Sequence, residues 1–363
     1  MNRIVWKLMA VSVYMLTAAP LQAGKIVIVA GGGQASPPCD ANEIQLKEPF
    51  YAEPDPQGRL VIAEMAMGQR VLRLDSTGAV KLLAGTGRKG GPANGPQPAT
   101  EASFDGIHNH AIDPKTGDIY FADTWNAVVR KFEAKSGQVV TIGGTGEKGF
   151  SGDGGPAKSA TFGGIYCVAL SPDSKRLYLA DLHNYVVRVI DLNSGIVSRV
   201  AGNGKKGRPK EGGKAVDEPL VDPRAVAEDK NGNVYVLERG GNALRVVRTD
   251  GTIRTVVNTK GKRGQGGLGG PATDSEMNGP KHIVIGRDGS VLIADAENHR
   301  ILRYRPEQGD LILVAGTGQV GKSGLNGPPE EAQLNRPHGV FESADGTIFI
   351  TDSYNDRVLK IIP

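Results

Sequence analysis

The strongest constraint on the fold is an internal repeat with a period of 57 to 59 residues. Each repeat has a short apolar stretch that ends in an acid, then a polar turn, then a strand that carries a basic residue. A regular period of this length is typical of propellers and solenoids. The six acids are Glu64, Asp123, Asp181, Glu238, Asp295 and Asp352.

Turn residues divide each repeat into four short strands. In the second repeat the expected strands cover residues 107–113, 118–123, 127–133 and 138–142. The chain has 51 Gly and 22 Pro among 363 residues, which is too many for long helices. Four antiparallel strands in each of six repeats predict an all-β fold, a six-bladed β-propeller, and disfavour a helical solenoid.

The sixth repeat lacks its fourth strand. Residues 26–33 match residues 311–318, which form the expected outer strand of the fifth repeat. We therefore expect the N-terminal strand to pair with residues 357–361 and to close the last blade. Such closure would also remove an open sheet edge.

Residues 1–23 have the pattern of a secretory signal peptide. A basic start and an apolar run over residues 8–19 precede Ala23, a small residue suited to cleavage. A retained anchor is the alternative, but the run is short for a bilayer. We expect a monomeric propeller over residues 24–363, periplasmic or secreted, with no membrane span after cleavage.

Charge and cysteine content narrow the function further. The formal net charge of +4 is modest and argues against a dedicated nucleic-acid-binding protein. Export would permit a disulfide between Cys39 and Cys167. They lie in different repeats, so two free thiols are the default expectation.

The repeat motifs resemble the NHL repeat. The clearest copies are Pro-His-Gly-Val at 337–340, Ala-Gly-Thr-Gly at 315–318 and Asp-x-x-Asn-x-Arg-Val at 352–358. Residues 149–157 are similar to the Gly-rich insert of bacterial members. The resemblance covers residues 25–363 and implies a six-bladed propeller. It is specific for fold and weak for function, because such propellers include binding platforms and enzymes.

The recurring acid, Asn and Arg look like a catalytic set, but six copies favour a structural role. We expect the acid to accept backbone N–H groups of the next turn and the Asn to adopt left-handed turn geometry. The Arg is expected to pair with an acid of a neighbouring blade.

Gly-rich inserts connect each outer strand with the next inner strand, as in residues 85–103, 143–161 and 202–219. We expect them to crowd one mouth of the channel, because these connections share a face. Their first halves are basic and their second halves acidic, which fits either a solvated rim or a collar for an anionic ligand. Asp153 has no counterpart in the other inserts, so a calcium loop is poorly supported.

The candidate site lies where the inner strands begin, because the residues there differ from blade to blade. Alternation places His110 on the same side of its strand as His108. Four of the six His residues would then lie at one level of the insert-bearing mouth. The first aligned position holds Phe50, His108, Tyr166, Arg224, Lys281 and His338, and the second holds Tyr51, Asn109, Cys167, Ala225, His282 and Gly339.

The resemblance extends to NHL-type amidating lyases, which cleave peptidyl-hydroxyglycine. It implies zinc held by His residues that follow Pro at these strand starts. Only His338 keeps the Pro-His pair, and His108 follows Ile107, so His110 or His282 would complete the set. Lactonases of the gluconolactonase type use acid and Asn ligands, which no position shows clearly. The sequence is compatible with zinc or calcium and requires neither.

Two hypotheses follow. The first is a non-enzymatic propeller that binds a protein or a small anionic ligand through its insert-bearing face. The second is a metal-dependent lyase or hydrolase at the channel mouth, with Tyr166 transferring a proton and Arg224 clamping an anion. In either case the binding surface is expected to include Phe50, Tyr51, Asn109, Lys281 and His282.

Overall fold

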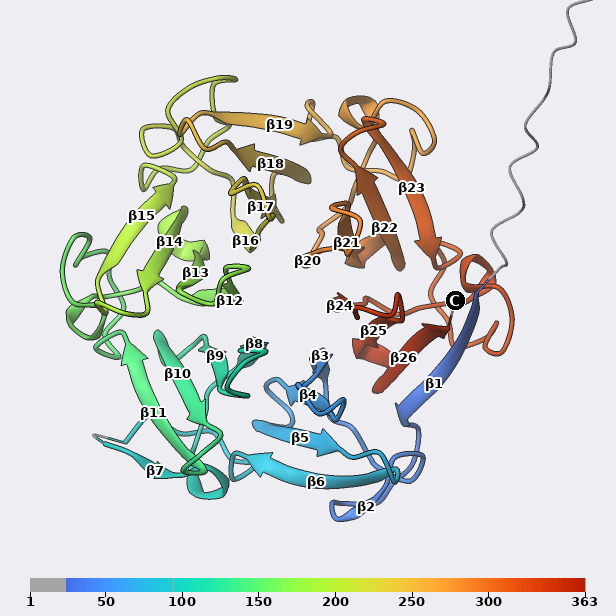
Figure 1. Ribbon diagram of the computed structural model, residues 1–363. Coiled ribbons are helices and arrows are strands. Elements are labelled where there is room, and N and C mark those ends of the chain that lie inside the picture. The colour runs from blue at the N-terminus through green and yellow to red at the C-terminus, as the bar shows by residue number, and fades with distance from the viewer. Residues whose placement is uncertain (1–23, 94, 363) are drawn as a thin grey trace, which may run out of the picture.

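The computed structural model describes residues 24–93 and 95–362, and these form six antiparallel sheets in a ring around a central channel (Figure 1). Each sheet is a blade whose first strand lies nearest the axis and whose fourth lies outermost. The six-bladed β-propeller predicted from the repeat is therefore confirmed. Within the described residues, no helix has the length and apolar character needed to cross a bilayer.

The strands have the following bounds, from the inner to the outer strand of each blade. Blades one to three are β3 (Pro49–Pro54), β4 (Leu60–Glu64), β5 (Arg70–Leu74) and β6 (Ala79–Ala84); β8 (Ile107–Ile112), β9 (Ile119–Asp123), β10 (Val128–Glu133) and β11 (Gln138–Gly143); and β12 (Ile165–Leu170), β13 (Arg176–Asp181), β14 (Val186–Asp191) and β15 (Val197–Ala201). Blades four to six are β16 (Pro223–Glu228), β17 (Val234–Glu238), β18 (Ala243–Val247) and β19 (Ile253–Val257); β20 (His282–Ile285), β21 (Val291–Asp295), β22 (Arg300–Arg305) and β23 (Asp310–Ala315); and β24 (Gly339–Glu342), β25 (Ile348–Asp352), β26 (Arg357–Ile362) and β1 (Lys25–Gly31).

The remaining described elements are short. Two-residue strands β2 (Cys39–Asp40) and β7 (Gln97–Pro98) lie outside the outer strands of blades one and two. Single helical turns occur within four inserts and after three second strands. They are η1 (Ala99–Glu101), η2 (Ala157–Ser159), η4 (Ala272–Asp274), η6 (Pro329–Glu331), η3 (Leu182–Asn184), η5 (Ala296–Asn298) and η7 (Ser353–Asn355).

The core lies between adjacent blades. Second strands such as β21 are buried at each position, because a neighbouring blade covers either face. Leu237 of β17, for example, shares one apolar cluster with Ile293 of β21 and Tyr178 of β13. Burying an aliphatic side chain of this size stabilises the fold by about 1.5–3 kcal/mol.

The N-terminal strand closes the ring as predicted. β1 runs antiparallel to β26, with Ile26 opposite Ile361 and Lys25 opposite Ile362. It occupies the outer position of blade six, beside the C-terminal strand (Figure 1). The ring is therefore sealed by hydrogen bonds between the two ends of the described chain.

The inserts do not gather around the channel mouth, and this expectation was wrong. Their middle parts pair with the outer strand of the following blade, as β7 does with β11. Pro156 forms an equivalent bridge to Ile196, and Pro271 forms one to Asp310. In Figure 1 these connections lie at the outer corners of the ring. They are placed there because an outer strand has free N–H and C=O groups that need partners.

The recurring acid, Asn and Arg fix the insert to its own blade. Asp181 accepts the backbone N–H of Gly163 at 2.9 Å, and the Asn184 amide donates to the Gly149 carbonyl at 2.7 Å. The expected structural role is therefore confirmed, but the backbone N–H that the acid accepts belongs to the preceding insert and not to the next turn. The Arg pairs within its own blade, as Arg357 does with Asp352 at 2.7 Å. The expectation of an acidic partner in the neighbouring blade was therefore wrong.

The left-handed residue of the turn also differs from the expectation. In blades two, three, five and six it is the residue after the Asn, namely Ala127, Tyr185, His299 and Asp356, with φ between 50° and 55°. Only blade four has the positive φ on the Asn itself, at Asn242. In the other blades the Asn side chain is needed for hydrogen bonding to the insert, so the residue after the Asn adopts the left-handed turn geometry.

Candidate functional site

The two faces of the ring are named here by their connections. The insert side is the face where the inner strands begin, and the hairpin side is the face where they turn into the second strands. A β-bulge interrupts the start of the inner strand in blades one to four, for example between Pro49 and Tyr51. Because a bulge breaks the alternation of side chains, two successive residues can face the channel there.

The first aligned position forms a packed ring on the insert side. Phe50 stacks on His338 with ring centroids 3.9 Å apart, and it meets His108 edge-on at 5.5 Å. His108 contacts Tyr166 at 4.4 Å, and the Arg224 guanidinium lies over Tyr166 at 4.8 Å. The structure therefore brings these five sequence-predicted residues together, and all except Tyr166 are buried.

Burial and positive charge keep the histidines of this ring neutral. Burial and the nearby Arg224 hold the pKa of His108 and of His338 well below the usual range. Burial also lowers the pKa of Lys281 to about 8, although its ammonium lies 3.1 Å from Glu297. The ring thus combines neutral imidazoles with two buried cations.

The histidines do not converge as a metal-binding set would. Phe50 contacts both His108 and His338, and the Nδ1 atoms of these residues face backbone carbonyls of Gly106 and Arg336. Over residues 24–93 and 95–362, no group of three or more His, Cys, Asp or Glu side chains is placed to hold a metal ion. The geometry therefore gives the zinc hypothesis no support.

His110 and His282 belong to a second layer, deeper in the channel. His110 meets the Tyr51 ring at 5.0 Å, and His282 meets the same ring from the other side at 4.5 Å. The expectation that His110 lies at the level of His108 was wrong, because residues two apart on a strand differ in depth by about 6–7 Å; His110 lines the cavity below, and His108 does not. The histidines therefore form two pairs in two layers.

Two further residues of the second layer are structural. The Asn109 amide bridges to blade three through Val168, donating to its carbonyl at 2.9 Å and accepting its N–H at 2.8 Å. Cys167 is buried beside it, and both Cys167 and Cys39 are free thiols.

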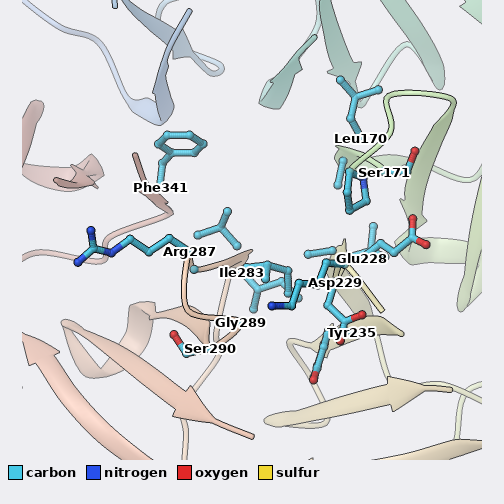
Figure 2. Close-up of a pocket in the computed structure, with 18 of the residues that line it drawn as sticks. Leu170, Ser171, Glu228, Asp229, Tyr235, Ile283, Arg287, Gly289, Ser290 and Phe341 are labelled. Atoms are coloured by element: carbon cyan, nitrogen blue, oxygen red, sulfur yellow. The ribbon is translucent and has the colours of Figure 1, made fainter. Parts of the chain in front are cut away.

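Beyond the second layer the channel opens into a cavity of about 860 Å³ on the hairpin side. None of the insert-side ring residues lines it, whereas Tyr51, Asn109, His110 and His282 do. Figure 2 shows side chains from several blades around this space, including Leu170, Tyr235, Ile283 and Phe341. Its walls combine apolar and polar side chains, and its rim consists of hairpin turns that carry exposed charges such as Lys230 and Arg287.

Sequence reasoning missed Glu53, which lies beside the second layer and lines the cavity. Its Oε2 atom accepts the Tyr51 hydroxyl at 3.2 Å, and its Oε1 atom lies 3.9 Å from Nε2 of His110. Burial raises the pKa of Glu53 to about 8 and lowers those of His110 and His282 to about 3. The repeat contained a signal, since the aligned positions are apolar: Ala111, Ala169, Ala227, Val284 and Phe341.

Several polar atoms of this layer have no hydrogen-bond partner. They are Oε1 of Glu53, both ring nitrogens of His110 and Nδ1 of His282, all buried. Buried polar atoms are usually paired, and exceptions call for an explanation such as a bound molecule. The group of Tyr51, Glu53, His110 and His282 is called the channel floor below.

The fold defines the class of protein, and its relatives support the motif assignment. No family model matches the sequence. Protein SUPPRESSOR OF QUENCHING 1, chloroplastic, from Arabidopsis thaliana is 31% identical over 263 residues, 70% of this chain and 24% of that protein. NHL repeat-containing protein 2 from Gallus gallus is 24% identical over 338 residues, 84% of this chain and 44% of that protein. The chain is a six-bladed β-propeller with NHL repeat-containing homologues, and it spans less than half the length of these relatives.

Solved propellers are similar in fold over most of the chain. An auxiliary nutrient binding protein from Bacteroides thetaiotaomicron has a TM-score of 0.66 and 13% identity, covering 93% of this chain and 76% of that one. A streptogramin B lyase has a TM-score of 0.54 and 14% identity, covering 93% and 97%. A gluconolactonase from Xanthomonas campestris has a TM-score of 0.56 and 12% identity, covering 94% and 90%. At such identities the likeness shows the fold alone.

Proposed function

We propose that the protein binds a small molecule in its central channel, entered from the hairpin side. The observation that carries this proposal is the cavity of about 860 Å³, which falls in the range of small-molecule sites. The proposed site lies at the mouth opposite the inserts, because hairpin-side residues line the cavity and none of the insert-side ring residues does.

A cavity-filling variant tests the proposal. Ala169 lines the cavity, so Ala169→Trp would occupy part of it without altering the insert side. Lys148→Trp is the control, because Lys148 is exposed on an insert. Neutral, anionic and cationic small molecules are screened by thermal shift and calorimetry. A compound whose binding is lost in Ala169→Trp and kept in Lys148→Trp is the expected result. The proposal is overturned if no class of compound binds, or if Ala169→Trp leaves binding intact.

A lyase or hydrolase is the second candidate. The observation in its favour is the pair of Glu53 and His110, whose facing atoms lie 3.9 Å apart beside the cavity. A carboxyl with a raised pKa and a neutral imidazole could act as acid and base. Mass spectrometry of a bound compound after prolonged incubation decides between the two: an unchanged compound leaves a binding protein, and a product lost in Glu53→Gln and His110→Gln indicates an enzyme.

We also propose that the propeller over residues 24–363 acts outside the cytoplasm after cleavage behind Ala23. The signal-peptide pattern lies in residues 1–23, outside the described residues. The fold similarity to nutrient binding proteins of Bacteroides is consistent with such a location. N-terminal sequencing of the mature protein tests this, and an intact residue 1 on protein from the cytoplasm would contradict it.

A further inference from the structure

The side chains of the channel floor limit the chemistry of the ligand that it would accept, and this inference rests on the function proposed above. The floor offers hydrogen-bonding atoms in several directions: Oε1 of Glu53, both nitrogens of His110 and Nδ1 of His282. The three side chains are more than nine-tenths buried, and all three line the cavity. A ligand that reaches the floor would meet donors and acceptors rather than a closed apolar surface.

The floor itself holds no Lys or Arg, and the acids Glu228, Asp229, Asp288 and Glu307 line the cavity nearer its rim. The basic residues that line the cavity are Lys230, Arg287 and Arg305, and all three lie in or beside turns at the rim. Arg224 belongs to the insert-side ring and is tied there by a 2.9 Å bond to the Tyr166 carbonyl. An anion at the floor would therefore lack a cationic partner, which disfavours the anionic ligand expected from the sequence.

Glu53 has no basic side chain to stabilise a negative charge. Its neighbours are the Tyr51 hydroxyl and the neutral ring of His110. A buried carboxyl in such surroundings keeps its proton and can both donate and accept a hydrogen bond. A cationic ligand would first require that proton to leave.

The walls suit the carbon skeleton of such a ligand. Ala227, Ile283 and Phe341 supply apolar surface from blades four, five and six. Sugars and cyclic polyols combine apolar C–H faces with hydroxyl groups that both donate and accept. We propose that the channel floor binds an uncharged, hydroxyl-bearing small molecule of the monosaccharide or cyclic polyol class.

The test uses probes that share a skeleton and differ in charge. The full-length mature protein is titrated calorimetrically with glucose, galactose, N-acetylglucosamine, sucrose and myo-inositol, and in parallel with glucuronate and glucosamine. At least one neutral probe is expected to bind, and at least tenfold more tightly than its charged counterparts. Such a ratio is typical when a buried charge is left without a partner.

Two substitutions of one residue separate the charge states of the floor. Glu53→Gln preserves an uncharged donor and acceptor, so it should weaken neutral-probe binding less than Glu53→Leu does. Glu53→Leu removes both and should weaken binding about tenfold or more. His282→Gln is a second floor variant, and His183→Gln, on the insert side, is its matched control. Circular dichroism verifies that each variant is folded.

Three outcomes overturn the inference. They are binding of glucosamine that is lost in Glu53→Gln, binding of glucuronate in preference to all neutral probes, and no binding of any neutral probe. If a charged probe binds and Ala169→Trp abolishes that binding, the proposed channel function stands while the neutral-ligand inference falls.

Discussion

The two ends of the channel are built from the same repeat and differ in how they are filled. On the insert side, large side chains pack against one another in a ring, as in the stack of Phe50 on His338 and the contact of His108 with Tyr166. On the hairpin side, four of the six aligned positions hold small or aliphatic residues, such as Ala111 and Ala227, and a cavity remains. Side-chain size at a few inner-strand positions thus decides which mouth is open.

The difference shows that polar character does not by itself locate a ligand site in a propeller. The insert-side ring has more ionisable residues, yet they are satisfied by stacking, backbone carbonyls and the ion pair of Lys281 with Glu297. The floor has fewer, but Glu53 and His110 keep unpaired atoms. Unpaired buried atoms next to open space are the better indicator.

The largest expected effect tests whether the insert side is a packed core. Phe50→Ala should lower the free energy of unfolding by about 3–5 kcal/mol, because a buried aromatic ring leaves a cavity. Phe341→Ala, at the partly exposed cavity wall, should cost about 1 kcal/mol. Chemical denaturation measures both. Equal losses would mean that the two ends are packed alike.

A second prediction uses the opposite pKa shifts at the two ends. Burial raises the pKa of Glu53 from 4.5 to about 8, so the unfolded chain releases a proton in this window while the folded chain retains it. The contribution of Glu53 to wild-type stability therefore falls as the pH rises from about 4.5 to 8. Glu53→Gln lacks this loss, and its stability relative to wild type should increase by about 2–4 kcal/mol across the window.

His338→Gln provides the contrast on the insert side. The pKa of His338 is held below its usual 6.5, so only the unfolded chain gains a proton as the pH falls through that value. The advantage of His338→Gln over wild type should therefore grow toward acidic pH, opposite to Glu53→Gln. Denaturation at a series of pH values gives both slopes, and two parallel slopes would refute the assigned protonation states.

The smallest expected change in stability comes from substitutions in the loops, one on each face of the ring. Asn184 donates to the Gly149 carbonyl and to Asp181, so Asn184→Ala should cost about 1–2 kcal/mol. Asn231 is exposed in a hairpin turn at the cavity rim, and Asn231→Ala should change stability by less than about 0.5 kcal/mol. Thermal unfolding of the pair measures this. A larger loss at Asn231 would show that the rim is structurally coupled to the blade.

The fold was predictable from the sequence because the information is repeated. The strands of the second repeat agree with the expected ranges to within one residue, and the pairing of β1 with β26 followed from one missing strand. Register in a blade is set by apolar alternation and turn chemistry, which six copies display in parallel.

The site was less predictable, because it depends on departures from the repeat. The bulge at the start of β8 changes which side chains face the channel, and no residue type announces a bulge at that place. The edge pairing of the inserts also depends on long-range contacts, such as Gln97 with Val139, that alignment of the repeats does not encode. Glu53 was visible in the alignment as a lone acid among apolar residues, but whether it was buried required the assembled ring.

The pairing of β1 with β26 also has a consequence for the order of folding. Blade six cannot be completed until the last strand exists, because its outer and third strands come from opposite ends of the chain. At translation rates of about 5–20 residues per second, β1 waits on the order of 15–60 s for its partner. Contacts this distant in sequence also slow folding. Throughout that interval an apolar strand has an unpaired edge, so the ring is most exposed to aggregation just before it closes.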